Sequence, residues 1–302
     1  MRTIAVINQK GGVGKTTTVA NLGAAVADSG RGVCLIDLDP QAHLTLHFGL
    51  EPSDDQPGMY EVLSGDAKLT EALRQVRESL SLAPSSIDLA GAEVEMVNTV
   101  GREQVLRDAL AEADLKYDFA FIDCPPSLGL LTLNALAAAD EVVIPLQPHF
   151  LALQGLGKLL ETVSLVQRRI NPTLRVSGVI LCMYETTTRL AGEVRDDLRD
   201  FLASARGGDA PWSDAHVFET FIRRNVKLAE CPSYGTTIFD YDVSSHGAKD
   251  YAALAAEFLS LTTALPVRRE DVPQQYVPQW AVRDVADASS PDSRQQSSEP
   301  RE

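Results

Sequence analysis

The stretch IAVINQKGGVGKTT, residues 4–17, determines the fold and the chemistry of this chain. A short apolar run leads into a glycine-rich turn, and the turn ends in Lys15 and Thr16. Apolar residues at helical spacing follow, so the stretch predicts a strand, a phosphate-binding loop and a helix. Glycines let backbone N–H groups close around phosphate oxygens, and the start of the helix adds partial positive charge at the same place.

Two side chains of this loop carry chemistry of their own. Lys15 would supply positive charge to the β- and γ-phosphates of a nucleotide, and the Thr16 hydroxyl would bind Mg²⁺. The sequence therefore predicts ATP and Mg²⁺ as cofactors. The residues of the loop that we expect to contact the nucleotide are Lys10, Gly11, Gly12, Val13, Gly14, Lys15, Thr16 and Thr17.

Two later strand-like runs end in acidic residues. Residues 32–36 lead into DLDPQ, residues 37–41, and residues 117–122 lead into Asp123. Open α/β sheets bind ligands beside the carboxyl ends of their strands, so these acids are expected near the phosphate loop. We predict that Asp123 helps to hold the Mg²⁺ shell. The structural alternative is that both segments are turns, because Asp and Pro favour turns by themselves.

The phosphate loop departs from the general pattern in an informative way. Gln9 stands where the pattern has its first glycine, and a second lysine, Lys10, precedes the glycines. KGGVGKTT, residues 10–17, is the deviant Walker A motif, and it resembles the ParA/MinD class of P-loop ATPases.

Three further segments are similar to the ParA (Soj-like) family within that class. They are DLDPQ, residues 37–41, DCPPSLG, residues 123–129, and FIRRNVKLAECPSYG, residues 221–235. The resemblance covers about residues 1–262. It implies an α/β fold of the P-loop NTPase type, with a doubly wound, mostly parallel sheet and helices on both faces.

The resemblance also implies roles for single residues. Asp39 would position the attacking water and join Thr16 and Asp123 around Mg²⁺. Lys10 would reach the ATP of a second subunit, which makes Lys10, Lys15 and Asp39 the expected catalytic set of a homodimer that forms with ATP and loosens after hydrolysis. The other residues expected to contact the nucleotide are Pro40, Met183 and Arg224.

For partners, the resemblance implies a ParB-like activator and non-specific DNA, as in chromosome or plasmid partitioning. The net charge of −15 argues against a broadly basic DNA-binding surface. Thr187 also replaces an arginine of the family's M-Y-D-x-R-T segment. The candidates for a local basic patch are Arg189, Arg195, Lys227 and Lys249, and the alternative for each is an ordinary surface charge.

Two other functions stay open. One is a MinD-like positioning ATPase that acts on a protein scaffold or a membrane; the Pro- and Ser-rich C-terminal segment lacks the basic amphipathic pattern of a membrane anchor. The other is a scaffold that holds nucleotide without hydrolysing it. The presence of Lys10, Asp39 and Asp123 argues against that scaffold.

The remaining sequence predicts organisation rather than chemistry. We expect an ATPase domain over residues 1–265 and a disordered tail over residues 266–302. No apolar window is long enough for a transmembrane helix and no signal peptide is evident, so we expect a cytoplasmic protein, associated with the nucleoid if it binds DNA. Cys34, Cys124, Cys182 and Cys231 are expected to be buried thiols. His149 has no partner near it in the sequence and is expected to be a loop histidine, and Glu93, Glu95 and Glu112 are expected to form a solvated face.

Overall fold

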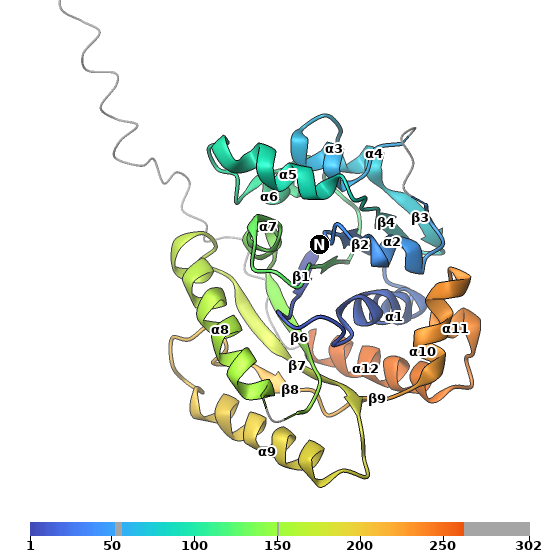
Figure 1. The fold of residues 1–302 in the computed structure, drawn as a ribbon, viewed down its shortest axis with the longest axis vertical. Coiled ribbons are helices and arrows are strands. Elements are labelled where there is room, and N and C mark those ends of the chain that lie inside the picture. Colours follow the sequence, from blue (N-terminus) through green and yellow to red (C-terminus); the bar gives the residue numbers. More distant parts are fainter. Residues whose placement is uncertain (52–55, 150, 263–302) are drawn as a thin grey trace, which may run out of the picture. The chain divides into compact units, whose positions relative to one another are not determined.

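A single sheet of nine strands forms the centre of the fold in the computed structural model, which describes residues 1–51, 56–149 and 151–262 (Figure 1). The strand order is β3-β4-β2-β5-β1-β6-β7-β8, and β9 also pairs with β7. The five central strands are parallel to one another. They are β2 (Val33–Asp37), β5 (Phe119–Asp123), β1 (Arg2–Val6), β6 (Glu141–Leu146) and β7 (Arg175–Tyr184).

Burial explains why these segments are strands. Every residue of β1, β2, β5 and β6 is buried, as expected for parallel strands that are covered on both faces. The edges are shorter: β4 (Leu80–Ala83), β8 (His216–Val217) and β9 (Ile222–Arg223) are parallel to their neighbours, whereas β3 (Arg74–Arg77) runs antiparallel to β4.

Helices cover both faces of the sheet. Alternate residues of β1 point to opposite sides: Ile4 packs with α1 and α12, whereas Ala5 packs with the side that holds α7, α8 and α9. This arrangement confirms the predicted doubly wound α/β fold. The helices are α1 (Lys15–Asp28), α2 (His43–His47), α3 (Met59–Ser64), α4 (Leu69–Ala72), α5 (Leu89–Glu95), α6 (Val105–Glu112), α7 (Leu130–Ala138), α8 (Ala152–Arg169), α9 (Arg189–Ser204), α10 (Val226–Glu230), α11 (Ile238–Tyr241) and α12 (His246–Thr262), with 3-10 turns at Met96–Asn98 (η1) and Cys231–Tyr234 (η2).

A buried ionic cluster fixes the amino ends of β1, β6 and β7. The Glu141 carboxylate, which is fully buried, accepts hydrogen bonds from Arg2 Nε at 2.6 Å and Arg175 Nη2 at 2.6 Å, and also from the Ser177 hydroxyl. Burial alone would raise the pKa of Glu141, but the hydrogen bonds and the charge of Arg2, together with the hydrogen bonds of Ser177 and Arg175, lower it below its usual range. The cluster therefore holds its charge inside the fold.

The opposite ends of the strands are aligned by the sheet register. Asp123 pairs with Val6 on one side and with Asp37 on the other. The carboxyl ends of β1, β2 and β5 thus lie side by side, and the segments that follow them are the phosphate loop, the DLDPQ segment and the DCPPSLG segment. This edge is where the sequence placed the functional site.

Two predictions concern other parts of the chain. No helix within the described ranges has the length and apolar character needed to cross a bilayer. The predicted tail at residues 266–302 lies outside the described residues.

Candidate nucleotide and magnesium site

The phosphate loop connects β1 to α1 with backbone geometry that favours glycine. Gly12 and Gly14 have φ angles of 70° and 96°, in the left-handed region that side chains rarely adopt. Gly14 is the residue before the first turn of α1, so the N–H groups at the start of the helix face the space enclosed by the loop. Lys15, the first residue of α1, is only 7% exposed. These features have the geometry expected of the phosphate-binding loop that the sequence predicts.

Thr16 and Asp123 meet directly at the aligned edge. Thr16 Oγ1 donates a hydrogen bond to Asp123 Oδ2 at 2.6 Å, while the buried Asp123 Oδ1 has no partner among the described groups. Burial raises the pKa of Asp123 well above its usual range, and the nearby Asp37 raises it further, against the hydrogen bond from Thr16 and the charge of Lys15. A buried carboxylate oxygen without a partner, beside a hydroxyl, suits a hard divalent cation such as Mg²⁺.

The two acids of the DLDPQ segment have different environments. Asp37 is fully buried and accepts hydrogen bonds from the Asp39 N–H at 3.1 Å, the Thr45 N–H at 2.9 Å and the Thr45 hydroxyl at 2.7 Å. Burial raises the pKa of Asp37 to about 7 despite these donors. Asp39 is 8% exposed, and its Oδ1 accepts the Gln41 N–H at 3.0 Å. Asp37 therefore fixes the backbone of the segment by accepting three hydrogen bonds, whereas the Asp39 carboxylate accepts one, from the Gln41 N–H.

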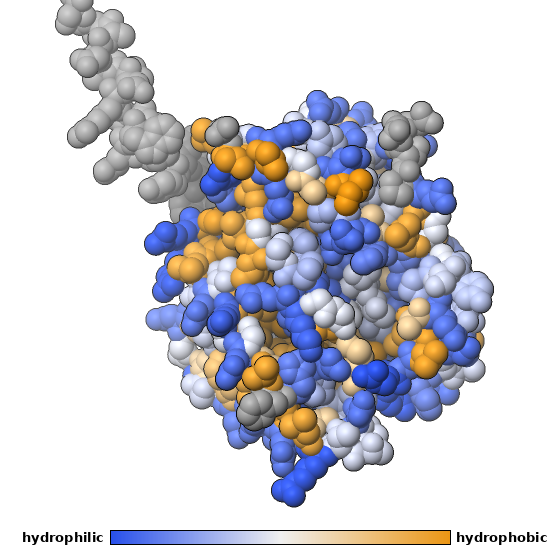
Figure 2. Space-filling model, in the orientation of Figure 1, coloured by the Kyte–Doolittle hydropathy of each residue, from blue (hydrophilic) through white to orange (hydrophobic). Residues whose placement is uncertain are grey.

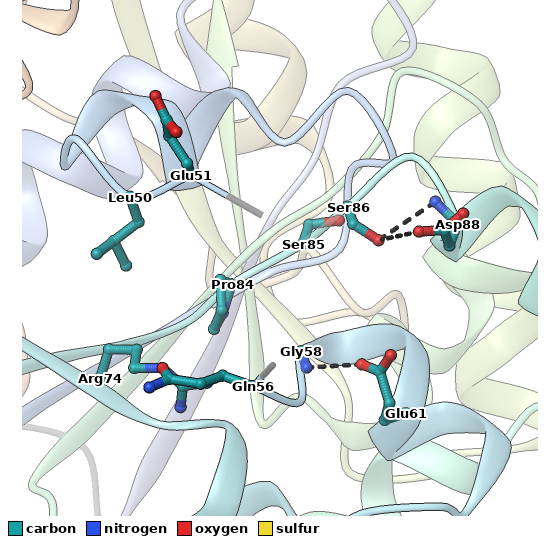
Figure 3. Close-up of a pocket in the computed structure, with 10 residues that line it drawn as sticks. All are labelled: Leu50, Glu51, Gln56, Gly58, Glu61, Arg74, Pro84, Ser85, Ser86 and Asp88. Carbon is teal, nitrogen blue, oxygen red and sulfur yellow. Dashed lines mark hydrogen bonds between the residues drawn. The ribbon is translucent and has the colours of Figure 1, made fainter. Parts of the chain in front are cut away.

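Ser85, which follows β4, supports this segment from a part of the chain for which the sequence predicted no site residue. The Ser85 hydroxyl donates to the Asp39 backbone carbonyl at 2.8 Å, and the Ser85 N–H donates to Thr45 Oγ1 at 2.9 Å. Ser85 and Ser86 also line a pocket of about 130 Å³, opposite Arg74 and Glu51 (Figure 3). No residue of the phosphate loop lines that pocket, so it is separate from the nucleotide site.

Lys10 has a partner that the sequence did not reveal. Its Nζ lies 2.9 Å from Nε2 of His149, in the segment between β6 and α8. His149 lies in a loop, as predicted, and the structure adds a contact that no neighbouring residue in the sequence indicated. The reason is topological: β1 and β6 are neighbours in the sheet, so the segments that follow them meet.

Glu93 is a correction, because it was predicted to be solvated. Its Oε1 accepts the Leu131 N–H at 3.2 Å and lies close to Gly129, at the start of α7. Glu93 therefore ties α5 to the segment that follows Asp123. A carboxylate at a helix start is stabilised by the free N–H groups there, but only the fold shows that α5 reaches α7.

The other predicted nucleotide contacts lie around the loop. Met183, near the end of β7, has a left-handed φ of 51°, and its neighbour Cys182 is within van der Waals distance of the position that a Gly14 side chain would occupy. Pro40 directly follows Asp39 and is half-buried. Arg224 is exposed and forms an ion pair with Glu185 at 3.3 Å.

The four candidate basic residues are distributed over three helices. Arg189 and Arg195 lie on α9 and pair with Glu193 and Asp196, at 2.9 and 3.2 Å. Lys227, on α10, pairs with Glu230 at 3.0 Å, and Lys249, on α12, is exposed. Nearby acids thus offset three of these four charges.

All four cysteines are buried, as predicted. Burial raises the pKa of Cys34 and Cys182 to about 12 and that of Cys231 to about 11, and it raises the pKa of Cys124 well above its usual range. Such thiols stay protonated and unreactive at neutral pH.

Comparisons with known proteins identify the family of this chain. A family model described as an AAA domain matches residues 1–176. The chain is 43% identical over 269 residues to "Chromosome partitioning protein ParA" of Myxococcus xanthus, which covers 89% of this chain and 91% of the relative. It is 45% identical over 255 residues to "Sporulation initiation inhibitor protein Soj" of Bacillus subtilis, which covers 84% of this chain and 96% of the relative.

A solved structure adds the same fold with ligands bound. It is the Mycobacterium smegmatis protein named cobyrinic acid a,c-diamide synthase, with bound ATP analog and magnesium. The TM-score is 0.73 at 39% identity, over 87% of this chain and 96% of that chain. The phosphate loop, the aligned acids and the two relatives together lead to one conclusion: this chain belongs to the ParA/Soj family of partitioning ATPases.

Proposed function

We propose that this protein hydrolyses ATP as a dimeric switch in DNA partitioning. One observation carries the proposal: the sheet register brings the phosphate loop, Asp123 and the segment that holds Asp39 to one edge. The names of the relatives, which include the chromosome partitioning protein ParA, support the same function.

The residues at this edge would have separate roles in the transfer of the phosphoryl group to water. Lys15 and the N–H groups at the start of α1 would bind and orient the phosphates. Thr16 and Asp123 would hold Mg²⁺, with Asp39 nearby, and bound Mg²⁺ would neutralise charge on the phosphate oxygens. Asp39 would orient the attacking water, because the Gln41 N–H fixes the position of its carboxylate at this edge. Catalysis would consist of alignment and charge neutralisation, with no covalent intermediate on the protein.

Lys10 is the residue that makes a dimer part of the proposal. Its side chain is exposed and contacts His149, whereas Lys15 is buried at the start of α1. Lys10 would therefore reach the nucleotide of a facing subunit rather than its own. Loss of the γ-phosphate after hydrolysis would weaken that contact and separate the subunits.

Exposed apolar side chains lie close to the same edge. Val94 on α5 is 73% exposed and Val97 in η1 is 52% exposed, and their neighbour Glu93 contacts the segment after Asp123. Apolar groups also gather over the α5 and α7 region in Figure 2. Apolar groups exposed in this way are typical of surfaces that bind other proteins, so we assign them to the dimer face or to a ParB-like activator.

DNA binding is the part of the proposal that depends most on charge. The chain has a net charge of −15, and acids pair with Arg189, Arg195 and Lys227. We propose that DNA binds to the ATP dimer alone, because a dimer doubles the number of basic groups on one surface.

Two other functions have less support. The MinD-like alternative has less support because the two relatives at 43% and 45% identity are named ParA and Soj. Amide transfer, which the name of the Mycobacterium smegmatis protein suggests for that protein, commonly uses a reactive thiol to release nitrogen from an amide donor. The four buried cysteines of this chain do not provide one.

The test is sedimentation with and without DNA, in ATP and in ADP, at two salt concentrations. We expect a Mg²⁺- and ATP-dependent dimer that co-sediments with DNA at low salt and is released at high salt. Lys10→Ala should bind ATP as a monomer but neither dimerise nor bind DNA, and Lys116→Ala, at an exposed position, is the matched control. Equal DNA binding in ATP and ADP would contradict the proposed switch.

A further inference from the structure

The contact between Lys10 and His149 joins two segments that are far apart in the sequence. The Lys10 Nζ lies 2.9 Å from His149 Nε2, across 139 positions of the chain. Lys10 belongs to the phosphate loop, and His149 follows β6. The deviant lysine of this protein is therefore engaged within its own subunit when no partner is present.

The backbone around Lys10 is fastened to the same place. The Lys10 N–H donates to Asn8 Oδ1 at 3.0 Å, and Asn8 Nδ2 donates to the Pro145 carbonyl of β6 at 2.7 Å. Asn8 thus ties the beginning of the loop to the strand that leads to His149. The contact follows from this anchoring and not only from the reach of a long side chain.

The chemistry of the contact depends on the protonation state of the ring. His149 Nε2 can accept a hydrogen bond from the Lys10 ammonium group only if the ring is neutral and its proton is on Nδ1. The Leu151 N–H lies 3.2 Å from Nδ1, so that nitrogen faces a donor as well. A neutral ring can accept from one of these two donors, and a doubly protonated ring can accept from neither.

Burial and a nearby positive charge shift the pKa of the His149 ring in the same direction. The pKa of His149 is lowered below its ordinary value of 6.5 by partial burial and then by the charge of Lys10. No acid within the described residues contributes to this shift. At neutral pH the ring is therefore neutral, and the tautomer that carries its proton on Nδ1 can accept from Lys10. On acidification the ring becomes a cation that repels Lys10.

We propose that His149 is a positioning residue that holds Lys10 inside its own subunit and thereby opposes ATP-dependent dimerisation. Each subunit breaks one Lys10–His149 contact when Lys10 moves to the partner's nucleotide. His149 thus sets how readily the dimer forms, and acid releases this restraint. The inference rests on the proposed function, because it assumes that Lys10 acts across a dimer.

The first test measures the contact without any dimer. The titration of His149 is followed by NMR in the nucleotide-free protein and in Lys10→Met, which keeps the length of the side chain but removes its charge. We expect the pKa of His149 to rise in Lys10→Met, because the charge of Lys10 lowers it in wild type. An unchanged pKa of His149 would overturn the inference whatever the dimer does.

The second test measures the dissociation constant of the ATP dimer by sedimentation at pH 8 and pH 5.5. His149→Ala should dimerise roughly 5- to 30-fold more tightly than wild type at pH 8, the range expected for losing two modest contacts per dimer. His149→Gln still offers a carbonyl to Lys10 but cannot titrate. We therefore expect it to match wild type at pH 8 and to lose the tightening that wild type shows at pH 5.5.

The outcomes distinguish a failure of the proposed His149 restraint from a failure of the proposed ATP-dependent dimerisation. His246→Ala should behave as wild type at both pH values. If His149→Ala and wild type dimerise equally, His149 does not restrain Lys10 and the inference fails. If wild type forms no dimer with ATP at all, the proposed function fails together with the restraint, although the titration experiment still decides whether the contact exists.

Discussion

Thr16 Oγ1 donates a 2.6 Å hydrogen bond to Asp123 Oδ2, while the other oxygen of the same buried carboxylate has no partner among the described residues. Asp123 also pairs in register with Asp37, which is itself fully buried. The fold therefore brings two buried carboxyl groups together at one edge of the sheet, at a cost that a bound cation would offset.

The first prediction concerns stability without metal or nucleotide. Burial raises the pKa of Asp37 to about 7 and that of Asp123 well above its usual range. In both cases the folded protein holds protons that the unfolded chain releases, so the free energy of unfolding should fall as pH rises from about 4 to about 7. Asp123→Asn removes one of these groups and should raise the melting temperature at pH 7 by several degrees.

Calorimetry from pH 4 to pH 8 checks this prediction, with the exposed Asp209→Asn as the control. Asp123→Asn should also show a smaller dependence on pH than wild type. It should lose Mg²⁺-dependent ATP binding, because Asn is a poorer ligand for Mg²⁺ than a carboxylate. A melting temperature below that of wild type at pH 7 would refute the account of Asp123 as a destabilising buried acid.

The second prediction concerns Lys15. This lysine is buried at the start of α1, where the phosphates would bind. Its positive charge would therefore contact them directly. Lys15→Ala should weaken ATP binding at least 10-fold, corresponding to the loss of about 1.5–3 kcal/mol from a charged hydrogen bond. Calorimetric titration with ATP and Mg²⁺ checks it, and Lys116→Ala, whose side chain is 87% exposed, should bind ATP as wild type does. Unchanged affinity in Lys15→Ala would remove the phosphate-loop assignment.

The main elements of this site could be predicted from the sequence because they are local. The glycine turn, Lys15 and Thr16 lie within one stretch, and Asp39 and Asp123 follow apolar runs that are strands in the structure. Hydrophobic pattern and turn chemistry act over a few residues, so one chain is enough to identify them.

The side-chain contacts that the sequence does not predict join segments that are far apart in the chain. His149 meets Lys10 only because β1 and β6 are adjacent, and Ser85 meets Asp39 only because β4 pairs with β2. Glu93 is followed by an exposed valine and resembles any surface acid in the sequence. Strand order in a parallel sheet is set by crossover packing, and no pattern within those three segments reports it.

The third prediction tests the role of Glu93. Its carboxylate accepts the Leu131 N–H at the start of α7, so Glu93→Ala leaves that N–H without this partner. We expect a loss of about 1 kcal/mol in the free energy of unfolding, similar to the loss of a helix cap. Denaturation by urea measures it, with Glu112→Ala as the control because the Glu112 side chain is 70% exposed. Equal stability of the two variants would show that Glu93 is the solvated acid that its sequence context suggests.

The fourth prediction concerns the buried cluster at the opposite edge. Glu141 has a lowered pKa, so its contribution to stability is present above its ordinary value of 4.5 and is lost as pH falls through the lower value of the folded state. Glu141→Gln leaves Arg2 buried without its counter-charge, and we expect a loss of about 3–5 kcal/mol. Thermal unfolding at pH 7 measures this loss. A change below about 1 kcal/mol would mean that the two arginines find other partners.

The last prediction separates binding from hydrolysis at Asp39. The Asp39 backbone N–H and carbonyl are held by Asp37 and Ser85, and its side chain accepts the Gln41 N–H. Asp39→Ala keeps the first two contacts, so the segment should keep its shape while the carboxylate is lost. We expect ATP binding and ATP-dependent dimerisation to persist while turnover falls by at least about 100-fold, in the range attributed to a positioned acid or base. Phosphate release and sedimentation on the same samples check both parts. A variant that dimerises and still hydrolyses ATP at the wild-type rate would show that another group orients the water.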